Sequence, residues 1–220
     1  HHNLAVDNDN SMLLGFTDSP LRRKCRMTSR QKQRRAELEA MYGRPDPQAV
    51  RKGMHALLSI VLNGCDEVVI RRDDHKAYPP AMRGLRCRIA HVVVSSKDRR
   101  DRHNPLWEIN VRDRVLRHAS ANHTRETLAW SKRRQCSSER LAIFTVWHNC
   151  VQWRREKRRR TTPAMEAGIL ERRLRPEEIL SKRLFPTMMA LPEVYADYYY
   201  GRVETPALGC NRRHELKTAF

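Results

Sequence analysis

The sequence predicts an α/β fold in which a mixed β-sheet is flanked by helices and followed by a basic helical C-terminal extension. Two observations indicate it. Short apolar segments typical of strands alternate with helix-forming segments through residues 1–150. Residues 151–220 are instead basic and interrupted by prolines, so we assign them to the extension. With 220 residues, 40% of them hydrophobic, the chain is long enough for one domain of ordinary size.

The chain opens with a predicted β-hairpin. Two apolar segments, LAV (4–6) and MLLGFT (12–17), flank the turn-forming cluster NDNS (8–11). Because the first segment begins almost at the start of the chain, we expect its strand to be short.

A basic helix is predicted next, over SRQKQRRAELEAMY (29–42). Thr28 or Ser29 is a suitable N-cap, and Gly43 follows the last helical residue. Few of its residues are apolar, so we expect a solvated helix, with contact to DNA as the alternative. We interpret the segment around 28–46 as an insertion.

The middle of the chain alternates helices and strands. The most regular amphipathic segment is 47–62, and apolar strand segments follow at 68–70 and 89–96. Tyr-Pro-Pro introduces a short helix between these strands, and another helix is predicted over 106–118. Without the insertion, this order of strands and helices is ribonuclease-H-like.

Two further helices are predicted toward the C-terminus. Residues 138–154 are largely apolar and favour a buried helix, and 176–185 favour a second one. Between 186 and the end, an aromatic patch, YADYYY (195–200), has no clear role in the sequence.

The charge of the chain indicates a polyanionic partner. Lys and Arg number 44 against 25 Asp and Glu, which gives a net charge of +19. We expect double-stranded DNA rather than a membrane surface, because no amphipathic helix with a clean basic face is evident. The six cysteines have no CxxC spacing, and no apolar run reaches 18 residues, so we expect an intracellular protein with reduced thiols.

The start of the chain indicates a fragment. It begins with His-His rather than Met and reaches the first apolar segment within three residues. We therefore expect an N-terminally truncated chain, although the two histidines are also compatible with an expression tag.

Three acidic residues follow or begin separate elements. Asp7 directly follows one apolar strand segment, Asp73 follows another after two arginines, and Glu108 lies in the first turn of a helix. Carboxylates brought together from separate elements can bind divalent cations, which prefer oxygen ligands. We therefore predict that Asp7, Asp73 and Glu108 are catalytic residues and ligands of two Mg²⁺ or Mn²⁺ ions.

Each acid also has an ordinary structural explanation. Asp7 lies in a sequence that favours a turn, and the helix dipole alone favours Glu108. Asp73 or its neighbour Asp74 is able to pair with an adjacent arginine.

Four motifs resemble the catalytic domain of bacterial insertion-sequence DDE transposases. They are LAVDNDN (4–10), RRDDHKAYPP (71–80), NPLWEIN (104–110) and RETLAWSKRRQ (125–135). Within them, the spacing of five between Asp73 and its following tyrosine, the Glu-x-Asn at Glu108, and an Arg-x-Thr-x-x-x-Ser-Lys segment match the family. The resemblance covers about residues 4–150.

The resemblance implies a ribonuclease-H-like fold, two divalent metal ions, and cleavage and transfer of DNA strands at element ends. It also implies a homodimer or larger synaptic complex on element ends and target DNA, and a cytoplasmic, nucleoid-associated bacterial protein. The acid assignment leaves alternatives open: Asp9 for the first acid, Asp74 for the second, and Glu126 or Glu139 for the third.

A set of basic residues flanks the acids in sequence and is expected to hold DNA phosphates. The set comprises Arg71, Arg72, Arg99, Arg100, Arg102, Arg125, Lys132, Arg133 and Arg134. Three hypotheses remain: a DDE transposase, a nuclease of the same fold, and an inactive or decayed transposase fragment that only binds nucleic acid.

Overall fold

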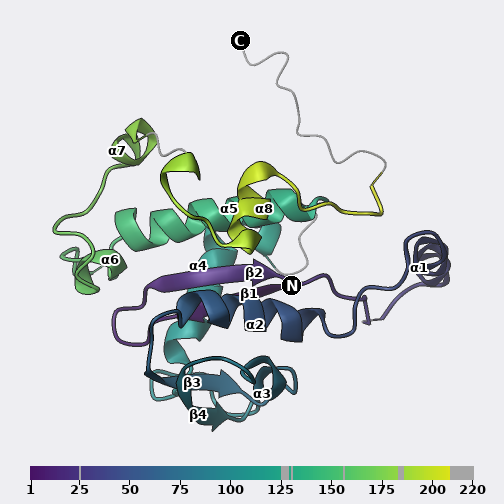
Figure 1. The fold of residues 1–220 in the computed structure, drawn as a ribbon, viewed down its shortest axis with the longest axis horizontal. Coiled ribbons are helices and arrows are strands. Elements are labelled where there is room, and N and C mark those ends of the chain that lie inside the picture. Colours follow the sequence, from purple (N-terminus) through teal and green to yellow (C-terminus); the bar gives the residue numbers. More distant parts are fainter. Residues whose placement is uncertain (25, 125–128, 130, 156, 183–185, 209–220) are drawn as a thin grey trace.

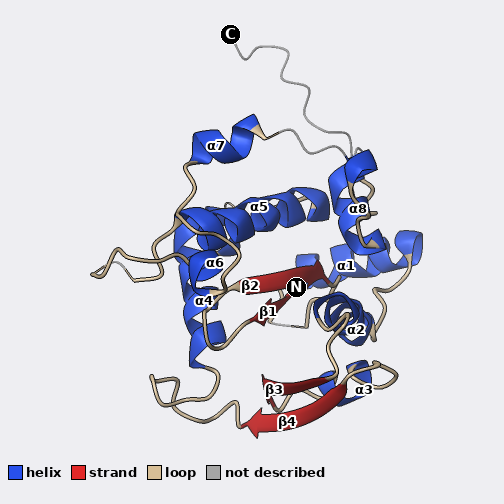
Figure 2. Cartoon of the chain, turned by 60° about the vertical axis from the view of Figure 1, so that its left-hand side comes forward, coloured by secondary structure: helices blue, strands red, loops and turns tan. Residues whose placement is uncertain are grey.

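The computed structural model describes residues 1–24, 26–124, 129, 131–155, 157–182 and 186–208. Figure 1 shows an α/β arrangement in which helices lie on both sides of a short β-hairpin. Helices α5 and α8 cover one side of the hairpin, and α2 lies on the other side, next to a second pair of strands (Figure 2). Among the described residues, no helix is long and apolar enough to cross a membrane.

The predicted N-terminal hairpin is confirmed. Strands β1 (His2–Val6) and β2 (Leu13–Asp18) pair antiparallel, with a register irregularity after Ala5. The turn is closed by backbone hydrogen bonds from Asp7 N to Met12 O and from Ser11 N to Asp7 O.

The second pair of strands is parallel. Strand β3 (Glu67–Asp73) pairs with β4 (Arg88–Val94), and α3 (Tyr78–Ala81) lies in the connection between them. Within the described residues, the strands form two separate two-stranded sheets, so the single mixed sheet that we predicted is not formed. Strands β1 and β3 are not hydrogen-bonded to each other, and residues of both strands line a cavity.

The basic helix is confirmed at both ends. Helix α1 spans Ser29–Tyr42, as predicted. Thr28 caps it: its side chain accepts a hydrogen bond from Gln31 N, and the Gln31 side chain accepts one from Thr28 N. Gly43 ends the helix with a positive φ of 78°.

Helix α2 (Ala49–Val61) packs against the hairpin. The segment is helical as its amphipathic pattern predicted, and Leu57 and Leu58 are buried. The close approach to β2 occurs at Gly53, whose carbonyl oxygen accepts a hydrogen bond from Thr17 Oγ1 at 2.8 Å.

Replacing Gly53 by alanine should destabilise the fold by about 2–3 kcal/mol, because inserting a methyl group into a tightly packed site forces the surroundings apart. A Cβ atom at Gly53 would lie 2.6 Å from Asn3 Nδ2 and even closer to Ser19 Oγ. Neither atom is free to move: Asn3 donates to Thr17 Oγ1 (3.0 Å) and Ser19 Oγ (2.9 Å). The clash should outweigh the gain in helix propensity, about 1 kcal/mol.

Urea unfolding of Gly53→Ala checks this expectation. Ser59→Ala, at an exposed position of the same helix, is the control and should change stability by less than about 0.5 kcal/mol. A Gly53→Ala protein as stable as the wild type would contradict the tight packing.

The main core lies between the hairpin and the helices of the second half of the chain. Helices α4 (Trp107–Ala119) and α5 (Arg134–Val146) contribute to it, and α5 continues into a π-helical segment (Trp147–Val151). The helix predicted over 138–154 therefore begins four residues earlier and ends as π-helix. The buried apolar cluster consists of Leu13, Phe16, Leu116, Leu141, Phe144 and Tyr198.

The aromatic patch near the C-terminus belongs to this core. It forms α8 (Glu193–Tyr200), in which Tyr198 stacks on Phe16 with ring centroids 5.4 Å apart. The Tyr198 hydroxyl accepts a hydrogen bond from Asp18 N (2.8 Å), so α8 is joined to β2 by packing and by hydrogen bonding. The remaining short elements are η1 (Ala121–His123), α6 (Pro163–Glu166), α7 (Pro176–Ser181) and η3 (Pro186–Met188).

Candidate functional site

A cavity of ≈ 850 Å³ lies between the facing edges of β1 and β3. The C-terminal part of α2, residues at the two ends of α3, the loop before α4, and α4 as far as Arg117 also line it. All three predicted acids, Asp7, Asp73 and Glu108, line this cavity.

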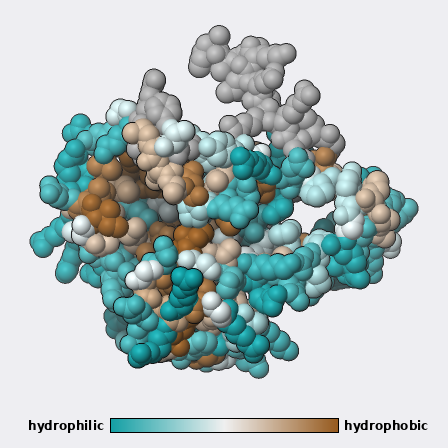
Figure 3. All heavy atoms as spheres, viewed as in Figure 1, coloured by the Kyte–Doolittle hydropathy of each residue, from teal (hydrophilic) through white to brown (hydrophobic). Residues whose placement is uncertain are grey.

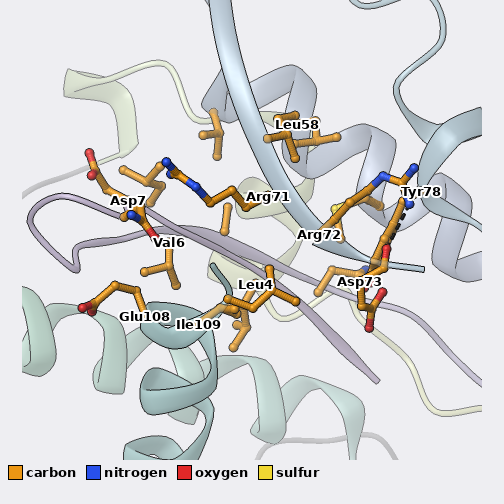
Figure 4. A pocket seen from close by; sticks show the side chains of 18 of the residues that line it. Leu4, Val6, Asp7, Leu58, Arg71, Arg72, Asp73, Tyr78, Glu108 and Ile109 are labelled. Carbon is orange, nitrogen blue, oxygen red and sulfur yellow. Dashed lines mark hydrogen bonds between the residues drawn. The ribbon is translucent and has the colours of Figure 1, made fainter. Parts of the chain in front are cut away.

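The three acids do not form one cluster. Figure 4 shows Asp7 and Glu108 at one end of the cavity and Asp73 beside Tyr78 at the other end. Among the described residues, no group of three His, Cys, Asp or Glu side chains is placed to hold a metal ion. In this arrangement, the structure brings two of the predicted ligands to the same end and leaves the third apart.

Asp7 organises the turn between β1 and β2. Its Oδ1 accepts hydrogen bonds from the backbone N–H groups of Asp9 (2.8 Å) and Asn10 (3.4 Å), and its Oδ2 accepts from Asn10 Nδ2 (3.1 Å). Turn chemistry therefore uses both carboxylate oxygens of Asp7. Its neighbour Asp9, the alternative first acid, also lines the cavity.

Asp73 ends β3 with its carboxylate accepting a hydrogen bond from His75 N (3.1 Å). Arg72 donates to the Asp73 backbone oxygen (2.9 Å) rather than to the carboxylate. Burial, followed by the nearby Asp73 charge, raises the pKa of Tyr78. The neighbouring Asp74 is exposed and does not line the cavity; Ser96 Oγ donates to it at 3.4 Å. Of the two acids, Asp73 is therefore the one that faces the cavity.

Glu108 lies in the first turn of α4, as predicted, and its Oε2 atom is held from two sides. Ser11 Oγ donates a hydrogen bond to it at 2.6 Å, and Arg112 Nη2 lies 3.7 Å away. Ser11 reaches this position with a positive φ of 66°, in the left-handed region. The strained turn residue thus points its hydroxyl group at the candidate third acid.

Two further residues extend the contacts around Glu108. His148, in the π-helical segment, is 1% exposed, and its Nε2 lies 3.1 Å from Arg112 Nη1. Burial is the main reason why the pKa of His148 is lowered. Nε2 also lies 3.2 Å from Ser11 O, and Nδ1 lies 2.9 Å from Gln152 Oε1, so the ring lies between Arg112, the β1–β2 turn and the end of the π-helical segment.

Arg154 supports the same turn from the C-terminal region. Its Nε donates to Ser11 Oγ (3.0 Å), its Nη2 donates to Asp9 O (2.8 Å), and it also forms an ion pair with Glu166. We refer to Ser11, Glu108, Arg112, His148 and Arg154 as the Glu108 network.

Sequence reasoning missed four members of this network. Only Arg112 had a local signal, because an acid and an arginine four residues apart face each other on a helix. Ser11, His148 and Arg154 come from distant parts of the chain, and no periodic pattern connects them to Glu108.

Among the described residues, neither alternative for the third acid is seen at the cavity. Glu139, on α5, accepts a hydrogen bond from Gln135 Nε2 at 2.8 Å and does not line the cavity. Glu126 lies outside the described residues.

The predicted phosphate-binding residues are spread over the surface. Arg71, Arg72 and Arg100 line the cavity, and Figure 4 shows the Arg71 side chain extending toward Asp7. Arg134 lies at the opposite end of the hairpin, where it pairs with Asp18 at 2.6 Å. The other predicted positions are divided as follows: Arg99, Arg102 and Lys132 are exposed, Arg133 is half-buried, and Arg125 is outside the described residues.

No protein-family model, curated protein or solved structure matches the chain. The geometry of the cavity and the sequence motifs are therefore the basis for the functional proposal.

Proposed function

We propose that the chain is a DNA strand-transfer protein of the DDE transposase type, which cleaves DNA at element ends and joins the ends to target DNA. The observation that carries the proposal is the placement of Asp7, Asp73 and Glu108. They come from three separate elements, and all line one cavity in a chain of net charge +19.

Phosphodiester cleavage requires an activated oxygen nucleophile and neutralisation of phosphate charge. Bound Mg²⁺ or Mn²⁺ ions would supply both, with Asp7, Asp73 and Glu108 as their ligands. The described arrangement does not fit such ions, because Asp73 lies at the far end of the cavity. Metal binding by all three acids would require Asp73 to lie closer to Asp7 and Glu108 than it does in this structure.

The arginines on the cavity wall match the proposed substrate. Arg71, Arg72 and Arg100 line the same cavity as the acids, so phosphates near the acids would meet positive charge. A ribonuclease-H-like order of strands and helices is part of this proposal, as are a homodimer or larger synaptic complex on double-stranded DNA and a place at the bacterial nucleoid.

A second candidate function is DNA binding without catalysis. The separation of Asp73 from Asp7 and Glu108 favours it, as does the use of both Asp7 carboxylate oxygens in the turn. A nuclease of the same fold, without strand transfer, is the third.

Two assays on the wild-type chain separate the three functions. Supercoiled plasmid should be nicked with Mg²⁺ or Mn²⁺ and remain intact in EDTA, and a pre-cleaved donor end should be joined to target DNA. Nicking without joining would identify a nuclease. If the chain binds DNA but neither nicks nor joins it with either metal, catalysis is excluded and the second candidate stands.

A further inference from the structure

Residues 20–24 and 26–46 form an arm that stands apart from the core. The arm contains α1 and the segments on both sides of it, and Figure 1 shows α1 at the edge of the molecule, beyond the end of α2. None of the residues of α1 is buried. Its capping box nevertheless fixes where the helix begins. Its surface therefore faces solvent or a partner rather than the hydrophobic core.

The arm is strongly basic. It holds nine Lys and Arg residues against three Asp and Glu residues. Four of these cations, Lys24, Arg26, Arg30 and Lys32, are exposed and have no ion-pair partner among the described residues. In Figure 3 the arm projects at the right edge, where hydrophilic residues predominate.

The Glu39 carboxylate contacts three arginines of the arm. Glu39 accepts two hydrogen bonds from Arg22, at 2.7 and 3.1 Å. Arg35 and Arg44 each approach the same carboxylate to 3.5 Å. The hydrogen bonds from Arg22 are the main reason why the pKa of Glu39 is lowered. Three guanidinium groups around one carboxylate leave an excess of positive charge in a fixed arrangement.

We propose that this arm binds the phosphate backbone of duplex DNA outside the cavity. Seven of its nine cations are arginines, whose planar guanidinium groups suit phosphate oxygens. A helix of 14 residues is about 21 Å long and thus spans several phosphates. An anionic membrane suits the arm less well, because Leu38, Met41 and Tyr42 occupy only the last turns of α1 and form no continuous apolar stripe.

The arm proposal shares with the proposed function only the DNA partner. Binding through the arm needs neither metal nor the cavity acids, so it is measured in EDTA. If the chain does not nick DNA but still binds DNA through the arm, the proposed catalytic function is wrong and the proposal that the arm binds DNA is supported.

Fluorescence anisotropy with a 30-bp labelled duplex over a series of NaCl concentrations tests the arm. Each phosphate contact contributes about −0.9 to the slope of log Kobs against log salt concentration. The variant K24Q/R26Q/R30Q/K32Q should therefore make that slope about 3 to 4 units less steep and weaken binding by more than about 10-fold at low salt. Circular dichroism should show an unchanged fold, because these side chains are exposed.

The matched control removes four exposed cations from another segment, in the variant K157Q/R158Q/R159Q/R160Q. It should change the slope by less than about 1 unit. Equal changes in the two variants would overturn the proposal, because the arm would then contribute only its share of net charge. Binding to phosphatidylserine vesicles that depends on the four arm cations, together with unchanged DNA binding, would also overturn it and assign the arm to a membrane surface.

Discussion

Asp73→Asn and Glu108→Gln are each expected to lower the rate of Mg²⁺-dependent plasmid nicking by at least about 100-fold, equivalent to about 2.7 kcal/mol of transition-state stabilisation. Each amide keeps the shape of the carboxylate that it replaces and removes its charge. Both acids line the cavity, and each change would remove one of the three carboxylates that the proposed function requires. Gel separation of supercoiled and nicked plasmid over time gives the rates.

The neighbouring carboxylate provides the control. Asp74→Asn changes an exposed acid that does not line the cavity, and nicking should stay within about 3-fold of the wild type. Activity lost in Asp74→Asn and kept in Asp73→Asn would move the assignment to Asp74. Nicking that survives both Asp73→Asn and Glu108→Gln would exclude the proposed site.

Truncation of Arg112 should destabilise the fold by about 3 kcal/mol, because removing one partner of a buried ion pair leaves the others without compensation. The side chain is 8% exposed and lies between Glu108 Oε2 (3.7 Å) and His148 Nε2 (3.1 Å). Burial lowers the pKa of Arg112, and the charge of Glu108 opposes this effect. Arg112→Ala therefore loses the packing of the arginine side chain, the ion pair with Glu108 and the contact with the buried His148 ring. Urea unfolding measures the change.

The same helix contains a matched pair for comparison. Arg117 pairs with Asp113 at the same spacing of four residues, but the two side chains are 34% and 42% exposed. Arg117→Ala should cost less than about 1 kcal/mol, since exposed ion pairs contribute little. If the two arginine variants are equally stable, burial of the Glu108 network does not contribute to folding.

Local signals were sufficient for most elements. Helix α1 begins at Ser29 and ends at Tyr42, as the cap residues and the following glycine predicted. The boundaries of α2 and α4 differ from the predicted ones by at most two residues. Capping, periodicity and turn chemistry act over a few residues, so one sequence is enough to show them.

The arrangement of the strands needed long-range information. Apolar patterning identified β1 and β3 but not the distance between their facing edges, which a cavity separates. The role of α8 could not be predicted from the sequence either, because its tyrosines pack on β2, about 180 residues earlier in the chain.

The sequence by itself identified the candidate acids, the basic charge and the limits of α1, α2 and α4, because these depend on residue type and short-range spacing. Only the tertiary structure decided that Asp7, Asp73 and Glu108 line one cavity, that Asp73 lies apart from the other two, and that Ser11, Arg112, His148 and Arg154 surround Glu108. Contacts of this kind arise when segments far apart in the chain pack together, and the free energy that selects them is spread over the whole core.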